Sequence, residues 1–386
     1  MRDVAVVGAG PAGSIAAERL AAQGHDVVLL EEHDETGLPV HCTGLLGFEA
    51  FDELDLPREI ILGRASAARF WAANGTSVLV QSDRVMAAVI DRAALDQTLA
   101  RRAVAAGAEL RRGWRAEQIA VEPRRVVIGR ADGQTVEARA CVLACGVSYR
   151  FHGPLGLGLP AAYMQSAQVE APVDASPTVE VRFGREVAPG GFAWLVPFHR
   201  GDTPYARIGL MCNAGGGQRF DAFTRSLSAE LGVDHEALPP PRRRLLPLAP
   251  VSKTFASRIL AVGDAAGLVK PTTGGGIYYG LLSGAMAADV LGPALRADLL
   301  GERELKRYET KWRQRLGPEI RTALAFRHLA ERLDDGAINS LIELARVNGV
   351  VPLLEETASF NWHRKAAVAL LSHAAFRRII LRSLCT

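Results

Sequence analysis

Three glycines near the N-terminus have the spacing of a loop that binds a pyrophosphate. Gly8, Gly10 and Gly13 follow a short apolar run, residues 3–7, and precede a segment with helical spacing of apolar residues. In such a turn the first glycine allows the bend, the second lets a pyrophosphate approach the backbone, and the third allows close packing. Glu31 ends the next apolar run, where a carboxylate can accept hydrogen bonds from a ribose. The pattern predicts dinucleotide binding, and the alternative is a structural turn with Glu31 in solvent.

A second glycine-rich segment carries further candidate cofactor contacts. Asp264 lies in the run GDAAG after another apolar stretch, and residues 271–277 read PTTGGGI. An aspartate there can bind a hydroxyl of a polyol, and the N–H groups at a helix start stabilise a developing anion. Taken alone, the segment also fits a structural turn capped by an aspartate. Together the two loops predict one long ligand laid across the sheet, which FAD matches better than NAD.

The neighbouring residues His41 and Cys42 lie in a loop, PVHCTGLLG, that admits four interpretations. A zinc site lacks partners, because the five cysteines have irregular spacings and no second pair, so no metal is predicted. A disulfide is open but not favoured, since the cysteine usage suits a reduced, cytoplasmic setting. A nucleophile–base pair is disfavoured because adjacent side chains on an extended chain point apart. The fourth interpretation is that a ligand beside the loop explains its residues.

The elements around these loops indicate an α/β fold with an inserted domain. The strand–helix–strand pattern of residues 3–32 begins a doubly wound, Rossmann-like sheet. Asn74-Gly75 predicts a hairpin, and residues 91–110 predict a helix. With 386 residues the chain is long enough for more than one domain. We predict a discontinuous FAD-binding domain at residues 1–62, 86–160 and 246–300. An antiparallel-sheet substrate domain, residues 63–85 and 161–245, is inserted into it. Residues 301–386 are predicted to form a helical C-terminal region.

Three segments together carry a family resemblance: GAGPAGSIAAERLA (8–21), IDRAALDQTLA (90–100) and GDAAGLVKPTTGGGI (263–277). They resemble flavoproteins of the p-hydroxybenzoate-hydroxylase type and, among these, the geranylgeranyl reductase family. The resemblance implies an FAD-dependent oxidoreductase that hydrogenates isolated C=C bonds of a geranylgeranyl or polyprenyl substrate in isoprenoid lipid metabolism. It also implies FAD contacts at Ala12, Glu31, Cys42, Thr43, Leu45, Arg92, Ala116, Asp264, Gly276 and Ile277. Arg92 has an alternative role: it can form an ordinary ion pair at a helix start with Asp96, four residues later.

The segment PGGFAWLVP (189–197) matches the substrate-domain motif of that family with two departures. Phe192 stands where the family has a tyrosine, so any proton or hydrogen-bond role of that hydroxyl is absent here. Val196 stands where the family has a second phenylalanine. Phe192 and Trp194 share one face of a strand by the period of two, and with Pro197 they are our candidate substrate-binding residues. The alternative is an ordinary sheet core.

The resemblance also suggests how the reaction proceeds. Hydride would come from N5 of reduced flavin to one alkene carbon, and an acid would protonate the other carbon. Cys42 is the first candidate acid, and Tyr278 and Tyr279 are weaker ones. The electron donor, NAD(P)H or reduced ferredoxin, is open because the chain has no second GxGxxG motif. Two alternatives are a flavin-dependent monooxygenase of the same fold and a membrane-surface flavoprotein that passes electrons to a quinone.

Composition limits the partners further. A formal net charge of +3 gives no reason to expect nucleic acid. Neither a signal peptide nor an apolar run long enough to span a bilayer is expected. The tail from residue 361 to 386 has no acidic residue and carries an apolar stripe, Phe376, Ile380 and Leu384. It predicts a basic helix that lies on anionic lipid at the inner face of the cell membrane or that faces a phosphorylated substrate. The alternative is a docked helix with solvated arginines.

Overall fold

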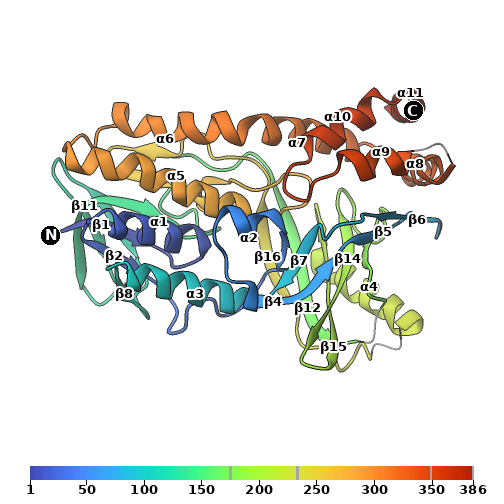
Figure 1. The fold of residues 1–386 in the computed structure, drawn as a ribbon, viewed down its shortest axis with the longest axis horizontal. Helices are drawn as coiled ribbons and strands as arrows, with labels where there is room; N and C mark the ends of the chain where they lie inside the picture. Colours follow the sequence, from blue (N-terminus) through green and yellow to red (C-terminus); the bar gives the residue numbers. More distant parts are fainter. Residues whose placement is uncertain (174–175, 232–233, 348–349, 385–386) are drawn as a thin grey trace. The chain divides into compact units, whose positions relative to one another are not determined.

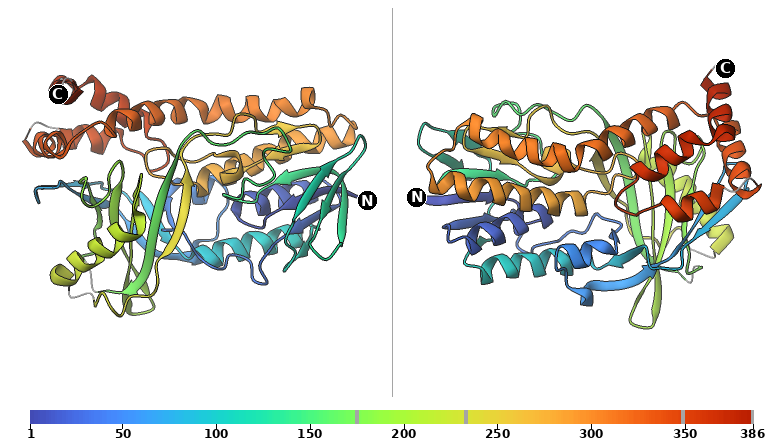
Figure 2. Two further views of the ribbon diagram at one scale, coloured as in Figure 1. Left: turned by 180° about the vertical axis from the view of Figure 1, so that it is seen from behind. Right: turned by 45° about the horizontal axis from the view of Figure 1, so that its top comes forward.

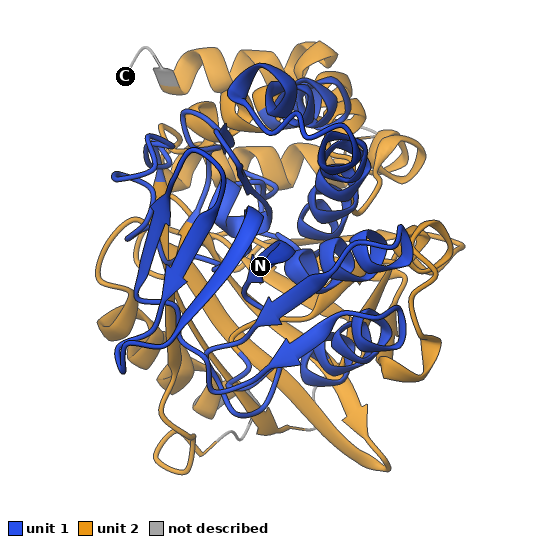
Figure 3. Ribbon diagram, turned by 90° about the vertical axis from the view of Figure 1, so that its left-hand side faces the viewer, with its two compact units in different colours: residues 1–40, 92–162, 247–320 blue, residues 41–91, 163–246, 321–386 orange. Residues whose placement is uncertain are grey.

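The computed structural model describes residues 1–173, 176–231, 234–347 and 350–384. The chain forms two compact units, each assembled from three segments (Figure 3). Unit 1 contains residues 1–40, 92–162 and 247–320, and unit 2 contains residues 41–91, 163–246 and 321–386. The chain therefore passes from one unit to the other five times, and both units are discontinuous in sequence.

Unit 1 is built on a parallel sheet with the strand order β8-β2-β1-β11-β18. This is the order of a doubly wound nucleotide-binding sheet and confirms the predicted fold class. The two N-terminal strands are apolar runs that are buried over most of their length, as a covered parallel sheet requires. The strand bounds are β1 Arg2–Val7, β2 Val27–Leu30, β8 Glu109–Arg111, β11 Thr135–Leu143 and β18 Ile259–Ala261, with the antiparallel additions β9 Gln118–Val121, β10 Val126–Gly129 and β17 Phe255–Ala256.

Small residues let the helices of unit 1 pack closely. α1 (Pro11–Ala22) and α5 (Ile277–Arg296) lie side by side (Figure 1), and α1 also packs on α3 (Arg92–Ala105). A Cβ built on Gly284 of α5 would lie 2.1 Å from the carbonyl oxygen of Ala12. No larger residue fits there without moving one helix. α6 (Glu302–Arg315) packs on α5 and β17, and α7 (Gly317–Ala330) follows it along the chain.

Unit 2 contains a large sheet with the order β16-β12-β15-β14-β13-β5-β6. The hairpin predicted at Asn74-Gly75 is confirmed, because β5 and β6 pair antiparallel across it. One pair departs from the antiparallel prediction: β13 and β5 run parallel, since they come from separate chain segments and no tight turn joins them. The bounds are β5 Ala67–Trp71, β6 Ser77–Gln81, β12 Tyr163–Pro172, β13 Val179–Arg182, β14 Phe192–Arg200, β15 Thr203–Cys212 and β16 Arg242–Pro247.

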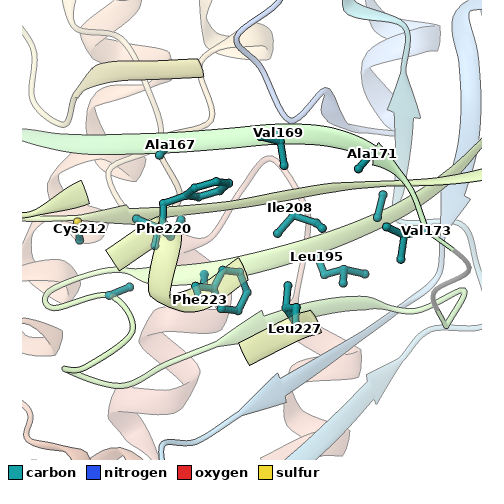
Figure 4. Close-up of a cluster of buried hydrophobic side chains, with 14 residues drawn as sticks. Ala167, Val169, Ala171, Val173, Leu195, Ile208, Cys212, Phe220, Phe223 and Leu227 are labelled. Atoms are coloured by element: carbon teal, nitrogen blue, oxygen red, sulfur yellow. The ribbon is translucent and has the colours of Figure 1, made fainter. Parts of the chain in front are cut away.

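One face of this sheet is covered by α4 (Gly216–Leu231). Phe220, Phe223 and Leu227 of α4 reach over Ile208 and Leu195 of the sheet (Figure 4). The alternation of strand residues puts Ala193 and Leu195 of β14 on this covered face. Phe192 and Trp194 of the same strand therefore belong to the opposite face.

The C-terminal helices pack on the β5–β6 end of the sheet (Figure 2). Phe376 and Ile380 of α11 are buried in a cluster with Val78 of β6 and Ile342 of α8. The apolar stripe of the tail thus packs on protein, which favours the docked-helix interpretation; the side chain of Leu384 lies outside the described residues. The bounds are α8 Asp335–Val347, α9 Val350–Thr357, α10 Arg364–Ser372 and α11 Ala374–Leu384.

The observed units move two of the predicted boundaries. Residues 41–62 and 86–91, assigned to the FAD-binding domain, belong to unit 2, because β3 (Leu45–Gly47), β7 (Ala87–Ile90) and β4 (Ile61–Ala65) form a small sheet and β4 packs on β14. The short helix α2 (Glu49–Glu53) follows β3. The predicted helical region 301–386 is also divided, since α6 packs in unit 1 and α8–α11 pack in unit 2.

Candidate cofactor and substrate sites

The three glycines of the first loop have three different surroundings. Gly8 has φ +107°, and a Cβ there would lie 2.3 Å from the carbonyl oxygen of Ala144. A Cβ on Gly13 would lie 1.9 Å from the carbonyl oxygen of Gly8, so the third glycine is required for packing. A Cβ on Gly10 would meet nothing within 4 Å. Gly10 is also the N-cap of α1 without a side-chain cap, so the open space and free helix N-terminus suit a pyrophosphate.

The Glu31 carboxylate is hydrogen-bonded to the backbone of that loop. Its Oε2 accepts a hydrogen bond from the Ala9 N–H (2.9 Å), and its Oε1 accepts from the backbone N–H (3.1 Å) and ring Nδ1 (2.7 Å) of His33. Glu31 is buried rather than solvated, which rules out its reading as a solvent-facing strand end. The ribose contact itself stays a prediction.

The second glycine-rich loop meets the first through α1. A Cβ on Gly263 would lie 2.9 Å from the Cβ of Ala12, and a Cβ on Gly276 would lie 2.6 Å from Oδ1 of Asp264. Asp264, Gly276 and the start of α5 at Ile277 are thus brought together, as the sequence suggested. Two aromatic side chains that the sequence did not indicate hydrogen-bond to the backbone of this loop. The Tyr149 hydroxyl donates to the carbonyl of Asp264 (2.7 Å), and His152 Nε2 donates to the carbonyl of Ala265 (2.6 Å).

Arg92 and Ala116 have structural partners within unit 1. Arg92 Nη2 donates to Oδ2 of Asp96 at 2.7 Å, so the predicted ion pair of the helix start is present. Burial raises the pKa of Asp96 to about 6; the nearby Arg92 charge opposes this, and the charge of Glu31 adds to it. The Ala116 carbonyl accepts a hydrogen bond from the Arg150 guanidinium. Their contacts with FAD stay predictions.

Cys42, Thr43 and Leu45 belong to unit 2. The Gly44 N–H donates to Cys42 Sγ (3.3 Å), and Leu45 pairs with Val89 in the small sheet. Cys42, Cys141, Cys145 and Cys212 are free thiols, and Cys385 lies outside the described residues. Among the residues that the structure describes, no group of three or more His, Cys, Asp or Glu side chains is arranged for a metal ion.

The weaker acid candidates lie at the start of α5. Tyr278 and Tyr279 are each 2% exposed. Burial raises the pKa of the Tyr279 hydroxyl, with smaller contributions from the charges of Glu319 and Tyr278, and a higher pKa makes this phenol a poorer proton donor. Cys42 therefore stays the first candidate.

An aromatic row lies on the face of the unit 2 sheet opposite α4. The rings of Phe192 and Trp194 are 5.9 Å apart, Phe183 lies 6.1 Å from Phe192, and Phe70 lies 6.4 Å from Phe183. The shared face of Phe192 and Trp194 is therefore confirmed. Pro197 does not join them, because its odd position in the regular β14 register puts it on the α4 face. Phe70 and Phe183 were not predicted, because only the β5–β13 pairing brings them to this row.

Comparison with known proteins identifies the fold and the family. A family model described as lycopene cyclase protein matches residues 3–344. Digeranylgeranylglycerophospholipid reductase 2 of Methanopyrus kandleri is 32% identical over 362 residues, covering 88% of this chain and 89% of that protein. The chain belongs to the geranylgeranyl reductase family. The digeranylgeranylglycerophospholipid reductase of Methanocaldococcus jannaschii is 30% identical over 361 residues, covering 88% of this chain and 90% of that protein.

Solved structures agree on the fold of this family member. A geranylgeranyl bacteriochlorophyll reductase-like protein from Thermoplasma acidophilum has a TM-score of 0.82 at 22% identity, covering 99% of this chain and 98% of that one. The halogenase PltM in complex with phloroglucinol and FAD has a TM-score of 0.67 at 16% identity, covering 99% of this chain and 90% of that one. The chain is an FAD-dependent oxidoreductase. It also belongs to the wider family described by the lycopene cyclase model.

Proposed function

We propose that this flavoprotein reduces isolated C=C bonds of a geranylgeranyl or polyprenyl chain carried by a lipid. Its membership of the geranylgeranyl reductase family is the observation that carries the proposal. Phe183, Phe192 and Trp194 of the aromatic row support it, because a wall of aromatic side chains suits an apolar chain without polar groups. Phe70, at the end of the row, packs against the cluster formed with the C-terminal helices.

We assign FAD to the loops of unit 1. The space over Gly10, the uncapped start of α1 and the carboxylate of Glu31 fit its pyrophosphate and ribose. Asp264, Gly276 and Ile277 suit its polyol and ring, with Arg92 and Ala116 as further contacts. Bound FAD supplies hydride transfer to one carbon of the alkene. The second carbon needs a proton, which we assign to the Cys42 thiol in the loop that begins unit 2.

The reaction can be tested on purified protein. Protein with its flavin is reduced without oxygen and incubated separately with geranylgeranyl diphosphate and with a digeranylgeranylglycerol phospholipid. A reductase adds one pair of hydrogens per double bond, which mass spectrometry detects. A cyclase leaves the product mass unchanged, and a hydroxylase adds oxygen only in air. Flavin present with no hydrogen added to either substrate would exclude the proposed reaction.

The same assay tests the acid and the electron donor. Cys42→Ala should keep its flavin spectrum and lose on the order of 10²-fold or more in turnover, the usual contribution of a positioned acid. Full turnover in Cys42→Ala would remove this residue from the proton step. NADPH, NADH and reduced ferredoxin are compared as sources of electrons in the same experiment, and quinone reduction without any change in the prenyl substrate would favour an electron carrier.

Although the apolar stripe of the tail is docked on protein, we propose that the exposed basic side of α11 contacts the inner face of the cell membrane. Arg377, Arg378 and Arg382 of α11 are exposed, while Phe376 and Ile380 are buried, so the helix presents its basic side outward. Such a surface attracts anionic lipid. Among the described residues no single helix is long and apolar enough to cross a bilayer. Only α8 and α9 taken together, a pair bent at the break between them, are long and apolar enough.

Vesicle binding tests this contact. Co-sedimentation with phosphatidylglycerol vesicles should exceed that with phosphatidylcholine vesicles and should fall with added salt. Changing Arg377 and Arg378 together to Gln should reduce it, whereas changing Arg242 and Arg244, exposed on the edge strand β16, serves as the control of equal charge. Equal loss in both double variants would show a general charge effect instead of a tail surface.

A further inference from the structure

Two buried polar side chains of the unit 2 sheet hold the backbone beside Cys42. Gln168 is on β12 and Arg207 is on β15, and both are on the face that carries Trp194. Each contacts Thr43, the residue after Cys42. We call the contacts of Gln168 and Arg207 with Thr43 the Thr43 anchor.

Gln168 joins the loop to the aromatic row through a single atom. Its Oε1 accepts hydrogen bonds from the Thr43 hydroxyl (2.6 Å) and from Trp194 Nε1 (3.2 Å). Because an indole N–H can only donate, the amide atom facing it must be the oxygen, which determines the orientation of the amide. A Cβ on Gly209 would lie 2.5 Å from the Trp194 ring, so the indole has little room to move away from Gln168.

Arg207 holds the same residue through the backbone. It is 1% exposed, and its Nη1 donates to the carbonyls of Thr43 (2.7 Å) and Ile90 (3.0 Å). Its Nε donates to Glu170 Oε2 at 3.0 Å, and its guanidinium lies 4.7 Å from the Phe198 ring centroid. A buried guanidinium is tolerated only when its donors are satisfied, so these contacts restrain the loop strongly.

Gly44 completes the anchor. Its φ of +66° is in the left-handed region, and a Cβ there would lie 2.3 Å from Arg207 Nη1 and 2.8 Å from the Ile90 carbonyl oxygen. The backbone can reach Arg207 only because residue 44 has no side chain. The Gly44 N–H in turn donates to Cys42 Sγ at 3.3 Å. The thiol therefore accepts a hydrogen bond from the residue that directly follows the anchored Thr43.

We propose that Gln168 and Arg207 are positioning residues that determine where the Cys42 thiol lies relative to the Trp194 side of the substrate wall. Oε1 of Gln168 accepts hydrogen bonds both from Trp194, part of the proposed substrate wall, and from Thr43, in the loop that carries Cys42. A displacement of Trp194 is then transmitted to Thr43. The inference rests on the proposed reductase function only for its catalytic consequence, since the anchor itself is a property of unit 2.

The first experiment measures the reactivity of the thiol in the full-length protein without substrate. The rate of alkylation of Cys42 by iodoacetamide is obtained by subtracting the rate in Cys42→Ser. Thr43→Val, which has the same shape without the hydroxyl, should raise that rate about fivefold, as the loss of one ordinary hydrogen bond allows the loop to open more often. Thr43→Ser keeps the hydroxyl and should react at the wild-type rate. Equal rates in Thr43→Val and wild type would overturn the anchor.

A second pair of variants tests the arginine. Arg207→Met should raise the alkylation rate more than tenfold, because it removes charge-assisted bonds. Arg200→Met is the matched control, since Arg200 also binds Glu170 but has no contact with Thr43. Equal acceleration in both variants would contradict a specific role of Arg207. Thr43→Val keeps the proposal testable if Arg207→Met does not fold.

Turnover then separates positioning from substrate binding. In Thr43→Val, kcat for alkene reduction should fall about fivefold with little change in KM, because the proton donor is displaced and not the substrate. A raised KM with unchanged kcat would make Thr43 a substrate contact and would contradict the positioning role. If alkylation responds as expected but the wild-type protein reduces no prenyl substrate, the proposed function fails while the anchor stands.

Discussion

The buried carboxyl of Asp96 gives a prediction whose sign and size follow from its surroundings. Asp96 is 4% exposed, and its Oδ2 accepts from Arg92 at 2.7 Å. Its Oδ1 has no hydrogen-bond partner among the described residues. Burial disfavours the ionised form more than Arg92 favours it, which raises the pKa of Asp96 from 3.8 to about 6.

The effect on stability follows by linkage. The folded protein holds this proton more tightly than the unfolded chain does, so the carboxyl favours folding when it is protonated. That contribution is present at low pH and is lost as pH rises through about 6. The full difference corresponds to about 3 kcal/mol, of which about 2 kcal/mol is lost between about pH 4.5 and about pH 7.5.

Asp96→Asn replaces the carboxyl by a neutral group of the same shape and removes this pH dependence. Urea unfolding at saturating FAD should show the variant more stable than wild type by about 1 kcal/mol at about pH 4.5. At about pH 7.5 the difference should reach about 3 kcal/mol, with an unchanged m-value. Asp132→Asn, in an exposed turn of unit 1, is the control and should show no such gain. A variant that is less stable at both pH values would show that Arg92 keeps the carboxylate ionised, which would refute this reasoning.

Three further substitutions test the two sites. Gly13→Ala should abolish FAD binding in a fluorescence titration or prevent folding, because its Cβ would lie 1.9 Å from the Gly8 carbonyl oxygen; unchanged affinity would contradict the observed packing. Glu31→Gln should weaken FAD about tenfold, since it replaces a charged acceptor of the Ala9 N–H by a neutral one, and the same titration at matched pH measures it. Gly209→Ala should displace Trp194, seen as a shifted tryptophan emission, and should raise KM for the prenyl substrate with FAD affinity unchanged.

Local spacing was enough to predict the cofactor half of the molecule. The spacing of Gly8, Gly10 and Gly13 directly after an apolar strand predicts a βα turn. A Cβ on Gly13 would clash with the nearby Gly8, whereas a Cβ on Gly8 would clash with the distant Ala144, a contact that the sequence does not show. The hairpin at Asn74-Gly75 and the helix close to residues 91–110 followed from equally local rules, with α3 observed over Arg92–Ala105. The shared face of Phe192 and Trp194 needed only the period of a strand.

The surroundings of Cys42 and of the aromatic row in unit 2 could not be predicted, because they are formed by contacts between distant segments of the chain. Thr43, Gln168 and Trp194 meet at one oxygen atom although 125 positions separate the first two, and Phe70 joins Phe183 only through a parallel strand pair. Burial of Phe376 and Ile380 also required the partner helices and strands, since an amphipathic pattern does not say whether lipid or protein covers it. The sequence by itself determined the cofactor loops, because their glycine spacing and the helix start after them lie within one short segment of the chain. Only the tertiary structure decided what surrounds Cys42, because strand register and packing place those side chains.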